Sequence, residues 1–305
     1  MISGVYVPLL TAFGGDGSVA PEAFARQAEW LVSRGADGLV PFGSTGEGPS
    51  LSLREKRVLL KALAAAVPGT PLVPAVTDPS LDGALQLVEV INDIDAAAIM
   101  LLPPFYFRQY GADGLRRFAE PVLAASRHPV LLYHIPEFAP AVPPGLVADM
   151  PVWGVKDSGG DLGYTRAVLA TGKQVMVGIE STVVEAVTAG AAGTIAGLAN
   201  VLPEPMLAAC SAAADGRVAD GHQVLASTLA FRDELLAAGS PLGWVSIMKR
   251  LAEERHGIPL GGVRAPLPDA TADALLPSLR DLLAQLELAS SNWPARTGQL
   301  MKAQS

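Results

Sequence analysis

Short apolar runs alternate with amphipathic segments along most of this chain, and this alternation restricts the possible folds more than any other feature. The runs are rich in β-branched residues and cover residues 5–10, 38–42, 72–76, 97–102, 130–135, 152–156, 175–178 and 193–195. Between them lie alanine- and leucine-rich segments with helical spacing, among them 21–34, 53–66, 81–91, 114–126 and 182–189. This pattern indicates parallel strands joined by helical crossovers.

Eight such strands within about 200 residues predict an α/β fold of the closed (β/α)8 type, a TIM barrel. A doubly wound open sheet is the competing fold, but it usually has fewer strands and often a G-x-G-x-x-G fingerprint, which this sequence lacks. Beyond the last run, residues 204–215, 217–238, 243–256 and 271–289 have helical patterns separated by glycine and proline. We therefore expect a barrel over 1–201, a C-terminal helical extension packed beside it over 202–289, and a frayed polar tail over 290–305.

Composition excludes several classes of protein. The chain has 305 residues, 50% of them hydrophobic, so it can bury a large core. Its net charge of -8 argues against binding to nucleic acid or to an anionic membrane surface. No apolar stretch approaches the ~18 residues of a membrane helix, and the N-terminus lacks a basic segment and a cleavage-like site. The single cysteine, Cys210, fits a reducing compartment, so the sequence predicts a cytoplasmic protein.

Lys156 ends the sixth run, and strand alternation places it on the same face as Val152 and Gly154. In barrel enzymes the reactive groups lie at the C-terminal ends of the strands and in the loops that follow. Burial of an ammonium is costly and favours the neutral amine, which is the nucleophile that forms Schiff bases with carbonyl substrates. We expect Gly154 to leave space beneath the lysine. The alternative is a lysine that extends to solvent, the default for an isolated one.

A glycine-rich loop follows the second predicted strand, where residues 43–48 read G-S-T-G-E-G. Its backbone N–H groups and the hydroxyls of Ser44 and Thr45 can converge on a small anion, and a substrate carboxylate suits such a nest. A phosphate is the other candidate, although the P-loop pattern with its lysine is absent. The alternative is a turn whose hydroxyls only cap the next helix.

Two tyrosines and a glutamate lie at the ends of other strands. Tyr133 shares a strand face with Leu131, so its hydroxyl can point into the barrel mouth and move a proton. His134 faces the other way and is expected to be a structural, hydrogen-bonded histidine. Tyr106 ends the fourth strand, where a lone tyrosine usually packs. Glu180 follows the seventh strand and either contacts substrate or begins the next helix, where a carboxylate is favoured.

Three of these strand ends together resemble the dihydrodipicolinate synthase / N-acetylneuraminate lyase family of class I, pyruvate-type aldolases. Residues 43–47 match its G-[ST]-T-G-E signature, residues 133–136 (Y-H-I-P) resemble its Y-N-[IVY]-P, and residues 154–158 (G-V-K-D-S) resemble its G-x-K-[DEQ]-[ST] Schiff-base strand. The resemblance covers the whole barrel and continues into the helical C-terminus. It implies a lyase that needs no metal or other cofactor and assembles as a homo-oligomer, often a tetramer.

The resemblance also implies catalytic roles. Lys156 would condense with the keto group of pyruvate or another 2-keto acid. The protonated iminium then withdraws electrons, so the adjacent carbon can lose a proton or break a C–C bond. Tyr133 would relay the proton, with its hydroxyl linked to Ser44 and to Tyr106. In the family, the matching second tyrosine can come from a neighbouring subunit.

Substrate-binding residues follow from the same resemblance. Ser44, Thr45 and the adjoining Gly43 would hold the carboxylate of the 2-keto acid. Ile195, after the eighth strand, lies where the family lines its site with backbone groups, and Glu180 is a further candidate. Together these residues predict a Schiff-base-forming lyase, an aldolase or dehydratase, that acts on pyruvate or a 2-keto-3-deoxy acid.

One departure from the family pattern bears on the second substrate. Synthases of the family carry an arginine two residues after the proline of the tyrosine motif, whereas here Glu137 and Phe138 follow Pro136. Loss of a bidentate donor removes a strong carboxylate anchor. Phe138 and Ala139 therefore predict a less polar or uncharged second substrate, and residues 48–51 and 156–158 resemble the 2-keto-3-deoxy sugar-acid enzymes. The alternative is a 4-hydroxy-tetrahydrodipicolinate synthase that condenses pyruvate with an amino-aldehyde.

Three rival interpretations belong to other classes. A metal-dependent aldolase would need ligand spacing that is not found among the four histidines, His128, His134, His222 and His256. A glycosidase could pair Glu47 with Glu180, but this leaves Lys156 unexplained, and Glu47 is expected to brace its own loop. A non-catalytic barrel that only binds a keto acid is the third. The joint presence of lysine, tyrosine and hydroxyls argues against it.

Overall fold

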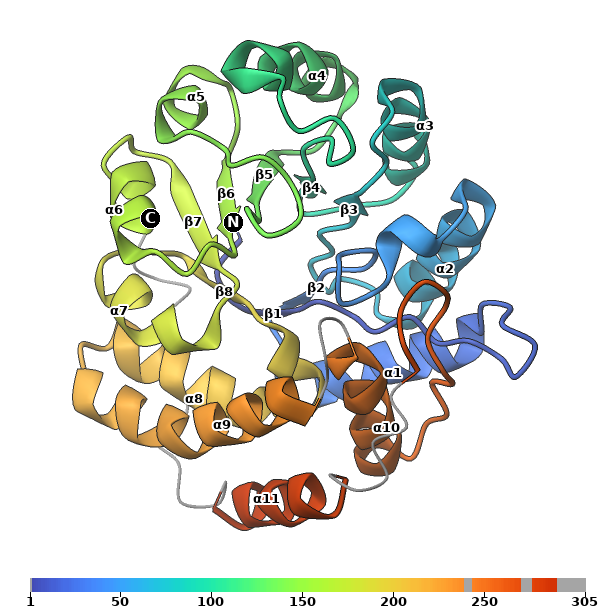
Figure 1. The fold of residues 1–305 in the computed structure, drawn as a ribbon, viewed down its shortest axis with the longest axis vertical. Helices are drawn as coiled ribbons and strands as arrows, with labels where there is room; N and C mark the ends of the chain where they lie inside the picture. The colour runs from blue at the N-terminus through green and yellow to red at the C-terminus, as the bar shows by residue number, and fades with distance from the viewer. Residues whose placement is uncertain (1, 239–242, 270–275, 290–305) are drawn as a thin grey trace.

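Eight short parallel strands form one sheet in the computed structural model, which describes residues 2–238, 243–269 and 276–289. The sheet order is β2-β1-β8-β7-β6-β5-β4-β3, and a parallel bridge between Leu39 and Leu72 joins its two edges (Figure 1). The predicted (β/α)8 barrel is therefore confirmed. The strands are β1 (Gly4–Val7), β2 (Gly38–Leu39), β3 (Ala75–Val76), β4 (Ile99–Leu101), β5 (Val130–His134), β6 (Gly154–Asp157), β7 (Gln174–Val177) and β8 (Gly193–Ile195).

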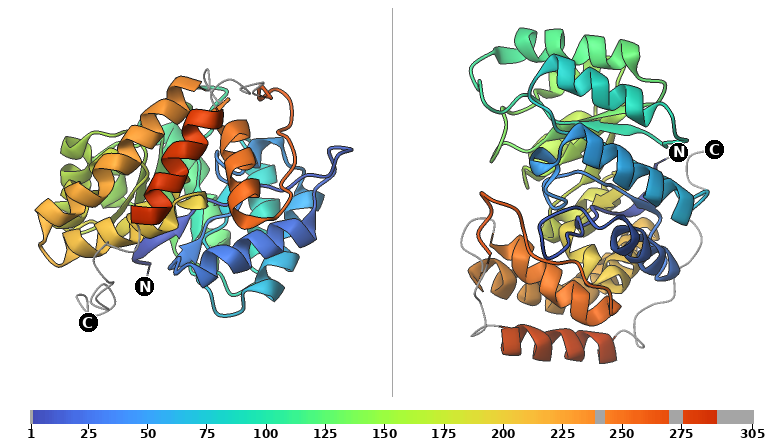
Figure 2. Two further views of the ribbon diagram at one scale, coloured as in Figure 1. Left: turned by 90° about the horizontal axis from the view of Figure 1, so that it is seen from below. Right: turned by 90° about the vertical axis from the view of Figure 1, so that its right-hand side faces the viewer.

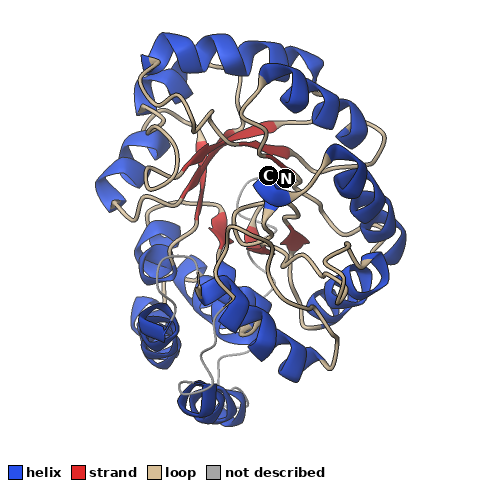
Figure 3. Ribbon diagram, turned by 45° about the vertical axis from the view of Figure 1, so that its right-hand side comes forward, coloured by secondary structure: helices blue, strands red, loops and turns tan. Residues whose placement is uncertain are grey.

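Helices follow the strands and surround the barrel (Figure 3). Side-chain caps begin several of them. Ser52 and Glu55, for example, form a capping box in which each side chain accepts a hydrogen bond from the other's backbone N–H. The outer helices are α1 (Pro21–Ser33), α2 (Leu53–Ala66), α3 (Leu81–Ile91), α4 (Gly111–Ala125), α5 (Pro144–Asp149), α6 (Leu162–Leu169), α7 (Val183–Thr188) and α8 (Pro203–Ala214). Short 3-10 turns occur at η1 (Gly48–Ser50), η2 (Glu180–Thr182) and η3 (Gly197–Asn200).

The strands are shorter than the apolar runs that predict them. Leu9 and Leu10, for example, are fully buried but lie beyond the end of β1. Apolar character reports burial on both faces of a parallel sheet, not the length of its hydrogen-bonded ladder. The helices α5 and α6 are not among the segments expected from the sequence, because one or two turns leave little room for a helical period.

The helix expected over 204–215, the first of the predicted extension, is α8, which packs on β1 and α7 in the ring around the barrel. The remaining helices of the extension pack beside the barrel: α9 (Val218–Ala238), α10 (Trp244–His256) and α11 (Leu276–Ala289). Helix α9 contacts α7 and α8, while α10 and α11 contact α9 (Figure 2). His256 at the end of α10 stacks on Trp30 of α1 with ring centroids 3.9 Å apart, and Arg255 forms an ion pair with Glu204 of α8. These contacts fix the extension on the barrel. The expected frayed tail over 290–305 lies outside the described residues, as do the first five positions of the helix expected over 271–289.

Among the described helices, none combines the length and the apolar character that a membrane crossing requires.

Candidate active site

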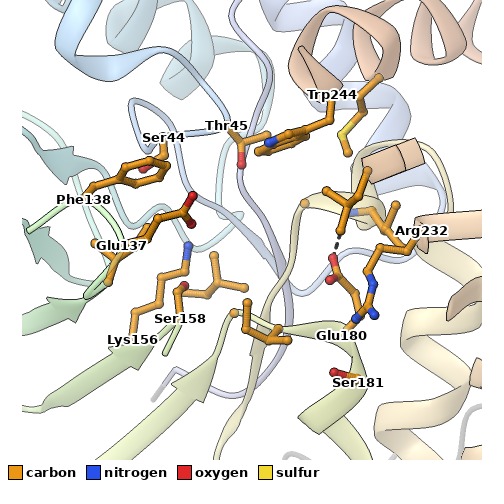
Figure 4. Close-up of a pocket in the computed structure, with 18 of the residues that line it drawn as sticks. Ser44, Thr45, Glu137, Phe138, Lys156, Ser158, Glu180, Ser181, Arg232 and Trp244 are labelled. Carbon is orange, nitrogen blue, oxygen red and sulfur yellow. Dashed lines mark hydrogen bonds between the residues drawn. The ribbon is translucent and has the colours of Figure 1, made fainter. Parts of the chain in front are cut away.

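A pocket of about 410 Å³ opens at the carboxyl ends of the strands. Strand ends and βα loops of the barrel supply one part of its wall, and helices α9 and α10 supply the other (Figure 4). The barrel contributes Ser44, Thr45, Tyr133, Ile135, Glu137, Phe138, Lys156, Ser158, Gly178, Ile179, Glu180, Ser181, Ile195, Gly197 and Leu198. The helical extension contributes Arg232, Leu235, Leu236, Trp244 and Met248.

Lys156 and Tyr133 form a cross-strand pair at the base of this pocket. They are register partners on β6 and β5, so their side chains leave the sheet side by side. The Lys156 Nζ donates a hydrogen bond to the Tyr133 hydroxyl at 3.2 Å and lies 4.4 Å from the centre of its ring. Only 5% of Lys156 and 2% of Tyr133 is exposed. The structure therefore brings together the amine and the hydroxyl that the sequence singles out.

The glycine that makes room for Lys156 is not the one expected from the sequence. A Cβ on Gly154 would lie 2.0 Å from the carbonyl oxygen of Gln174, so this glycine permits close approach of β6 and β7. It does not create the space beneath the lysine that the sequence suggests. A Cβ on Gly178 would lie 3.1 Å from the Lys156 Cε and 2.1 Å from the Ser158 Oγ. Gly178 thus provides the room for the lysine side chain.

The Tyr133 hydroxyl has an unusual electrostatic environment. Burial alone would raise its pKa, but the charge of Lys156 and hydrogen bonds with Ser44, Lys156 and Ser158 outweigh that effect. The net result is a pKa of Tyr133 below its ordinary value. A hydroxyl whose proton is held less tightly, and which contacts both an amine and two serines, is suited to passing a proton between neighbours.

The glycine-rich loop places Ser44 and Thr45 at the pocket. The loop folds on itself, because the N–H groups of Gly46 and Gly48 both donate to the Gly43 carbonyl. Within the described part of the chain, no protein acceptor meets the backbone N–H groups of Ser44 and Thr45. These two N–H groups and the two hydroxyls remain able to bind an anion, which favours the carboxylate nest over simple helix capping.

Glu47 braces this loop from behind. Its Oε1 accepts a hydrogen bond from the Lys249 Nζ at 2.6 Å, and its Oε2 accepts one from the Arg264 backbone N–H at 2.8 Å. Both side chains of the Glu47–Lys249 ion pair are 0% exposed. Lys249 also donates to the Gly262 carbonyl at 2.7 Å. Helix α10 and the segment after it therefore hold the 43–48 loop through a fully buried ion pair and a backbone hydrogen bond.

Glu180, Phe138 and Ile195 all line the pocket. Glu180 begins η2, and its Oε1 accepts a hydrogen bond from the Leu198 N–H at 3.2 Å (Figure 4). Burial raises its pKa, while hydrogen bonds from the Glu180 and Leu198 backbone and the charges of Arg232 and Lys156 act in the opposite direction. The sequence left two roles for Glu180, contact with substrate and the start of a helix. They are compatible, because Glu180 begins a helical turn and also faces the pocket.

Two candidate residues lie away from the pocket of the single chain. Gly43 is buried beneath the loop and contributes its carbonyl to the internal turn. Tyr106 is 80% exposed on the loop between β4 and α4, in edge contact with Phe107, which is 76% exposed. The link from Tyr106 to Tyr133 is therefore not made within one chain.

His134 has a structural role. Its Nδ1 accepts a hydrogen bond from the Val142 N–H at 3.1 Å, and its ring stacks on Tyr164 with centroids 3.8 Å apart. Burial lowers its pKa, against the opposing charges of Asp157 and Asp161. A neutral His134 is needed for Nδ1 to accept a hydrogen bond, so the histidine anchors the loop that carries Glu137 and Phe138.

Sequence reasoning did not foresee the residues contributed by α9 and α10, of which Arg232 and Trp244 are the largest. Their periodic spacing indicates helices, but spacing alone does not reveal which helical face meets the barrel mouth. Glu137 also lines the pocket from the mouth, and Ser158 lies beside Lys156. Ser158 directly follows β6, two residues beyond Lys156, and its place in the G-V-K-D-S motif is the signal that points to it.

The rival chemistries find little support in this geometry. Glu47 lies in the buried ion pair with Lys249 and does not line the pocket, so it cannot pair with Glu180 across a substrate. Residues 2–238, 243–269 and 276–289 contain no group of three or more histidine, cysteine, aspartate and glutamate side chains arranged to hold a metal ion.

Comparison with known proteins adds independent information. A sequence profile of the dihydrodipicolinate synthetase family matches residues 1–286. The 4-hydroxy-tetrahydrodipicolinate synthase of Thermomicrobium roseum is 30% identical over 291 residues, which cover 92% of this chain and 94% of that enzyme.

Solved structures agree in fold. The sialic acid aldolase of Ruminococcus gnavus has a TM-score of 0.89 at 20% identity, covering 96% of this chain and 99% of that one. A variant of the Sulfolobus solfataricus 2-keto-3-deoxygluconate aldolase has a TM-score of 0.84 at 24% identity, covering 95% of this chain and 98% of that one. At such identities the likeness is one of fold alone.

The buried ion pair leads to a first prediction. Lys249→Met leaves the Glu47 carboxylate buried without its cation, so we expect the free energy of unfolding to fall by about 3–5 kcal/mol. The double variant Glu47→Gln with Lys249→Met leaves no unpaired charge. Its free energy of unfolding should therefore fall by less than that of Lys249→Met alone. Urea denaturation measures both, and Lys61→Met on the exposed face of α2 is the control, with an expected change below about 0.5 kcal/mol. Purely additive losses in the double variant would contradict the pairing.

Proposed function

This chain belongs to the dihydrodipicolinate synthetase family, and on that premise we propose that it is a Schiff-base-forming lyase acting on pyruvate or a 2-keto-3-deoxy acid. The observation that carries the proposal is the Lys156 Nζ, buried at the base of the pocket and 3.2 Å from the Tyr133 hydroxyl. Lys156 forms no ion pair among the described residues, and its Nζ donates a hydrogen bond to the Tyr133 hydroxyl. An amine that lines the pocket beside a hydroxyl able to transfer protons is placed to attack the carbonyl carbon of a bound keto acid.

The first step joins the lysine to the substrate. Ser44 and Thr45 bind the carboxylate of the 2-keto acid and so place its keto carbon next to the Lys156 nitrogen. The amine adds to this carbon, the keto oxygen leaves as water, and an imine remains. Tyr133 transfers the protons that this exchange requires, since its hydroxyl contacts Lys156 and Ser44.

The second step uses the iminium as an electron sink. Loss of a proton from the carbon next to the iminium gives an enamine. Cleavage of the bond from that carbon to the following, hydroxyl-bearing carbon also gives the enamine: the hydroxyl proton passes to the Tyr133 relay, the bonding electrons move to the iminium nitrogen, and the far fragment leaves as an aldehyde. The enamine can then take up a proton or attack an aldehyde carbonyl carbon. Water finally hydrolyses the imine and returns the free amine. No metal or organic cofactor is needed in this sequence.

The identity of the second substrate separates two versions of the proposal. The Thermomicrobium roseum relative is a 4-hydroxy-tetrahydrodipicolinate synthase, and the same condensation of pyruvate with an amino-aldehyde is the alternative for this chain. Phe138 stands where such synthases carry an arginine. We therefore favour a 2-keto-3-deoxy acid aldolase or dehydratase, a class to which the Sulfolobus solfataricus structure also belongs.

We also propose a cytoplasmic location and a homo-oligomer. The single cysteine is buried and fits a reducing compartment. Tyr106 and Phe107 form an exposed aromatic pair, and a second copy of the chain is the partner that the family resemblance implies for it. In such an assembly Tyr106 could reach the Tyr133 hydroxyl of a neighbour.

Borohydride trapping tests the imine. After incubation with pyruvate, hydride transfer to the imine carbon should leave a stable secondary amine on the peptide that contains Lys156, detected by mass spectrometry. Lys156→Ala should form no adduct, while the exposed-lysine control Lys61→Ala should form it as the unaltered protein does. Absence of the adduct in the unaltered protein would refute the lyase and favour a barrel that only binds keto acids.

Replacement of the proton-transferring hydroxyl tests Tyr133. We expect Tyr133→Phe to retain trapping by pyruvate at equilibrium but to slow turnover by ~10²-fold or more, because the relay between Lys156 and Ser44 is lost. Stopped-flow and steady-state rates measure the two effects separately. Unchanged turnover would remove Tyr133 from the mechanism.

Sedimentation tests the assembly. The chain has a mass of 31.5 kDa, and we expect a species of two or four chains at micromolar concentration. Tyr106→Ala combined with Phe107→Ala should shift the distribution toward single chains, because it removes the exposed apolar contact. A single-chain mass for the unaltered protein would contradict the proposal.

A further inference from the structure

Arg232 brings a cation into the pocket from an element outside the barrel. It lies on α9, and Figure 4 shows its guanidinium beside the Glu180 carboxylate, on the opposite side of the pocket from Lys156. The loop that carries Phe138 provides no cation to the pocket lining. The pocket therefore has the Lys156 amino group at the base of the barrel and the Arg232 guanidinium at the helical extension.

The contacts of Arg232 leave it able to accept a ligand. Among the described residues its hydrogen-bond partner is its chain neighbour Asp233, whose Oδ1 accepts from Nε at 3.1 Å and from Nη2 at 2.7 Å. The Asp233 side chain is 66% exposed, whereas that of Arg232 is 20% exposed. An ion pair with so exposed a carboxylate contributes little, since water and salt screen it. A carboxylate held inside the pocket would compete with it successfully.

Glu180 does not cancel the charge of Arg232. No ion pair within hydrogen-bonding distance joins the two among the described residues, and the Glu180 Oε1 is engaged by the Leu198 N–H. Burial shifts the pKa of Glu180 upward, which favours its neutral form.

We infer that Arg232 forms a distal anion subsite, which recognises a second carboxylate at the end of the substrate remote from Lys156. The inference rests on the proposed lyase and specifies its substrate class: a 2-keto acid whose far end is also acidic. Guanidinium is suited to this task because its planar donors match both oxygens of a carboxylate. Ser44 and Thr45 would hold the first carboxylate, so the substrate would span the pocket.

The subsite reverses one expectation from the sequence. Phe138 in place of an arginine predicts an uncharged second substrate, but the cation is supplied from α9 in the same pocket. Arg232 would be a specificity-determining residue. It does not take part in imine chemistry, which is confined to the Lys156 end.

Matched keto acids test the subsite. 2-Oxoadipate and 2-oxohexanoate have the same carbon chain and differ in a terminal carboxylate, and both can be trapped on Lys156 with borohydride. We expect the unaltered protein to be half-saturated at a lower concentration of the diacid. Arg232→Gln should reduce the preference for the diacid by about 10–100-fold, the effect of losing a hydrogen-bonded charge. Arg232→Lys should retain part of the preference.

Two further variants complete the design. Arg217→Gln removes a cation just before α9, where its described partners are Asp215 and Asp220, and should leave the preference for the diacid intact. Asp233→Asn removes the competing carboxylate and should increase the preference. Circular dichroism and thermal unfolding of each variant show whether it is folded before binding is compared.

The outcomes separate this inference from the function on which it rests. No preference for the diacid in the unaltered protein, or a preference that Arg232→Gln leaves unchanged, overturns the subsite while adduct formation still supports the lyase. Trapping of pyruvate but of neither longer acid also overturns it, because the pocket would then not admit a chain that reaches Arg232. Failure to trap pyruvate itself overturns the proposed lyase.

Discussion

The register between β5 and β6 is the constraint on which the proposed chemistry depends. Tyr133 and Lys156 are paired residues of neighbouring parallel strands, so their side chains must leave the sheet at the same level and on the same face. A slip of one residue would turn one of them to the opposite face and separate the amine from the hydroxyl. Two glycines help to keep this arrangement. Gly154 allows β6 and β7 to approach closely, and Gly178 leaves space for the Lys156 side chain.

Two buried lysines show how the protein distinguishes structure from reactivity. Lys249 is matched by the Glu47 carboxylate and the Gly262 carbonyl, and it joins α10 to the loop that carries Ser44. Lys156 is buried to a similar extent but faces a phenol. The Lys249 Nζ is closed off by these two acceptors, whereas the Lys156 Nζ lies in the lining of the pocket. Access to the pocket beside the Tyr133 hydroxyl, not burial alone, makes Lys156 the candidate nucleophile.

The sequence predicted the features that depend on local pattern. Alternating runs and helices predicted the barrel, and strand alternation placed Tyr133, Lys156 and the 43–47 loop at one end of it. The sequence could not predict that Gly154 packs against Gln174, or that Gly178 is the glycine beside Lys156. Strand positions do not specify which neighbour approaches a residue most closely. The sequence also could not place Arg232, since the periodicity of α9 identifies a helix but not the partner of each face. The contact of Tyr106 with the Tyr133 hydroxyl of a neighbouring chain remains a prediction for the assembled protein.

The two halves of the pocket have different origins, and this division bears on how substrates are selected. Groups proposed to act on the keto acid come from strand ends, whose positions are fixed by hydrogen bonds of the barrel. Groups at the far end come from α9 and α10, which are held by side-chain packing and ion pairs. A helix face can exchange one side chain for another without disturbing a strand ladder. We therefore expect substitution on α9 to change which substrates fit at the far end of the pocket, while the imine chemistry proposed for Lys156, Tyr133 and the 43–48 loop is left in place.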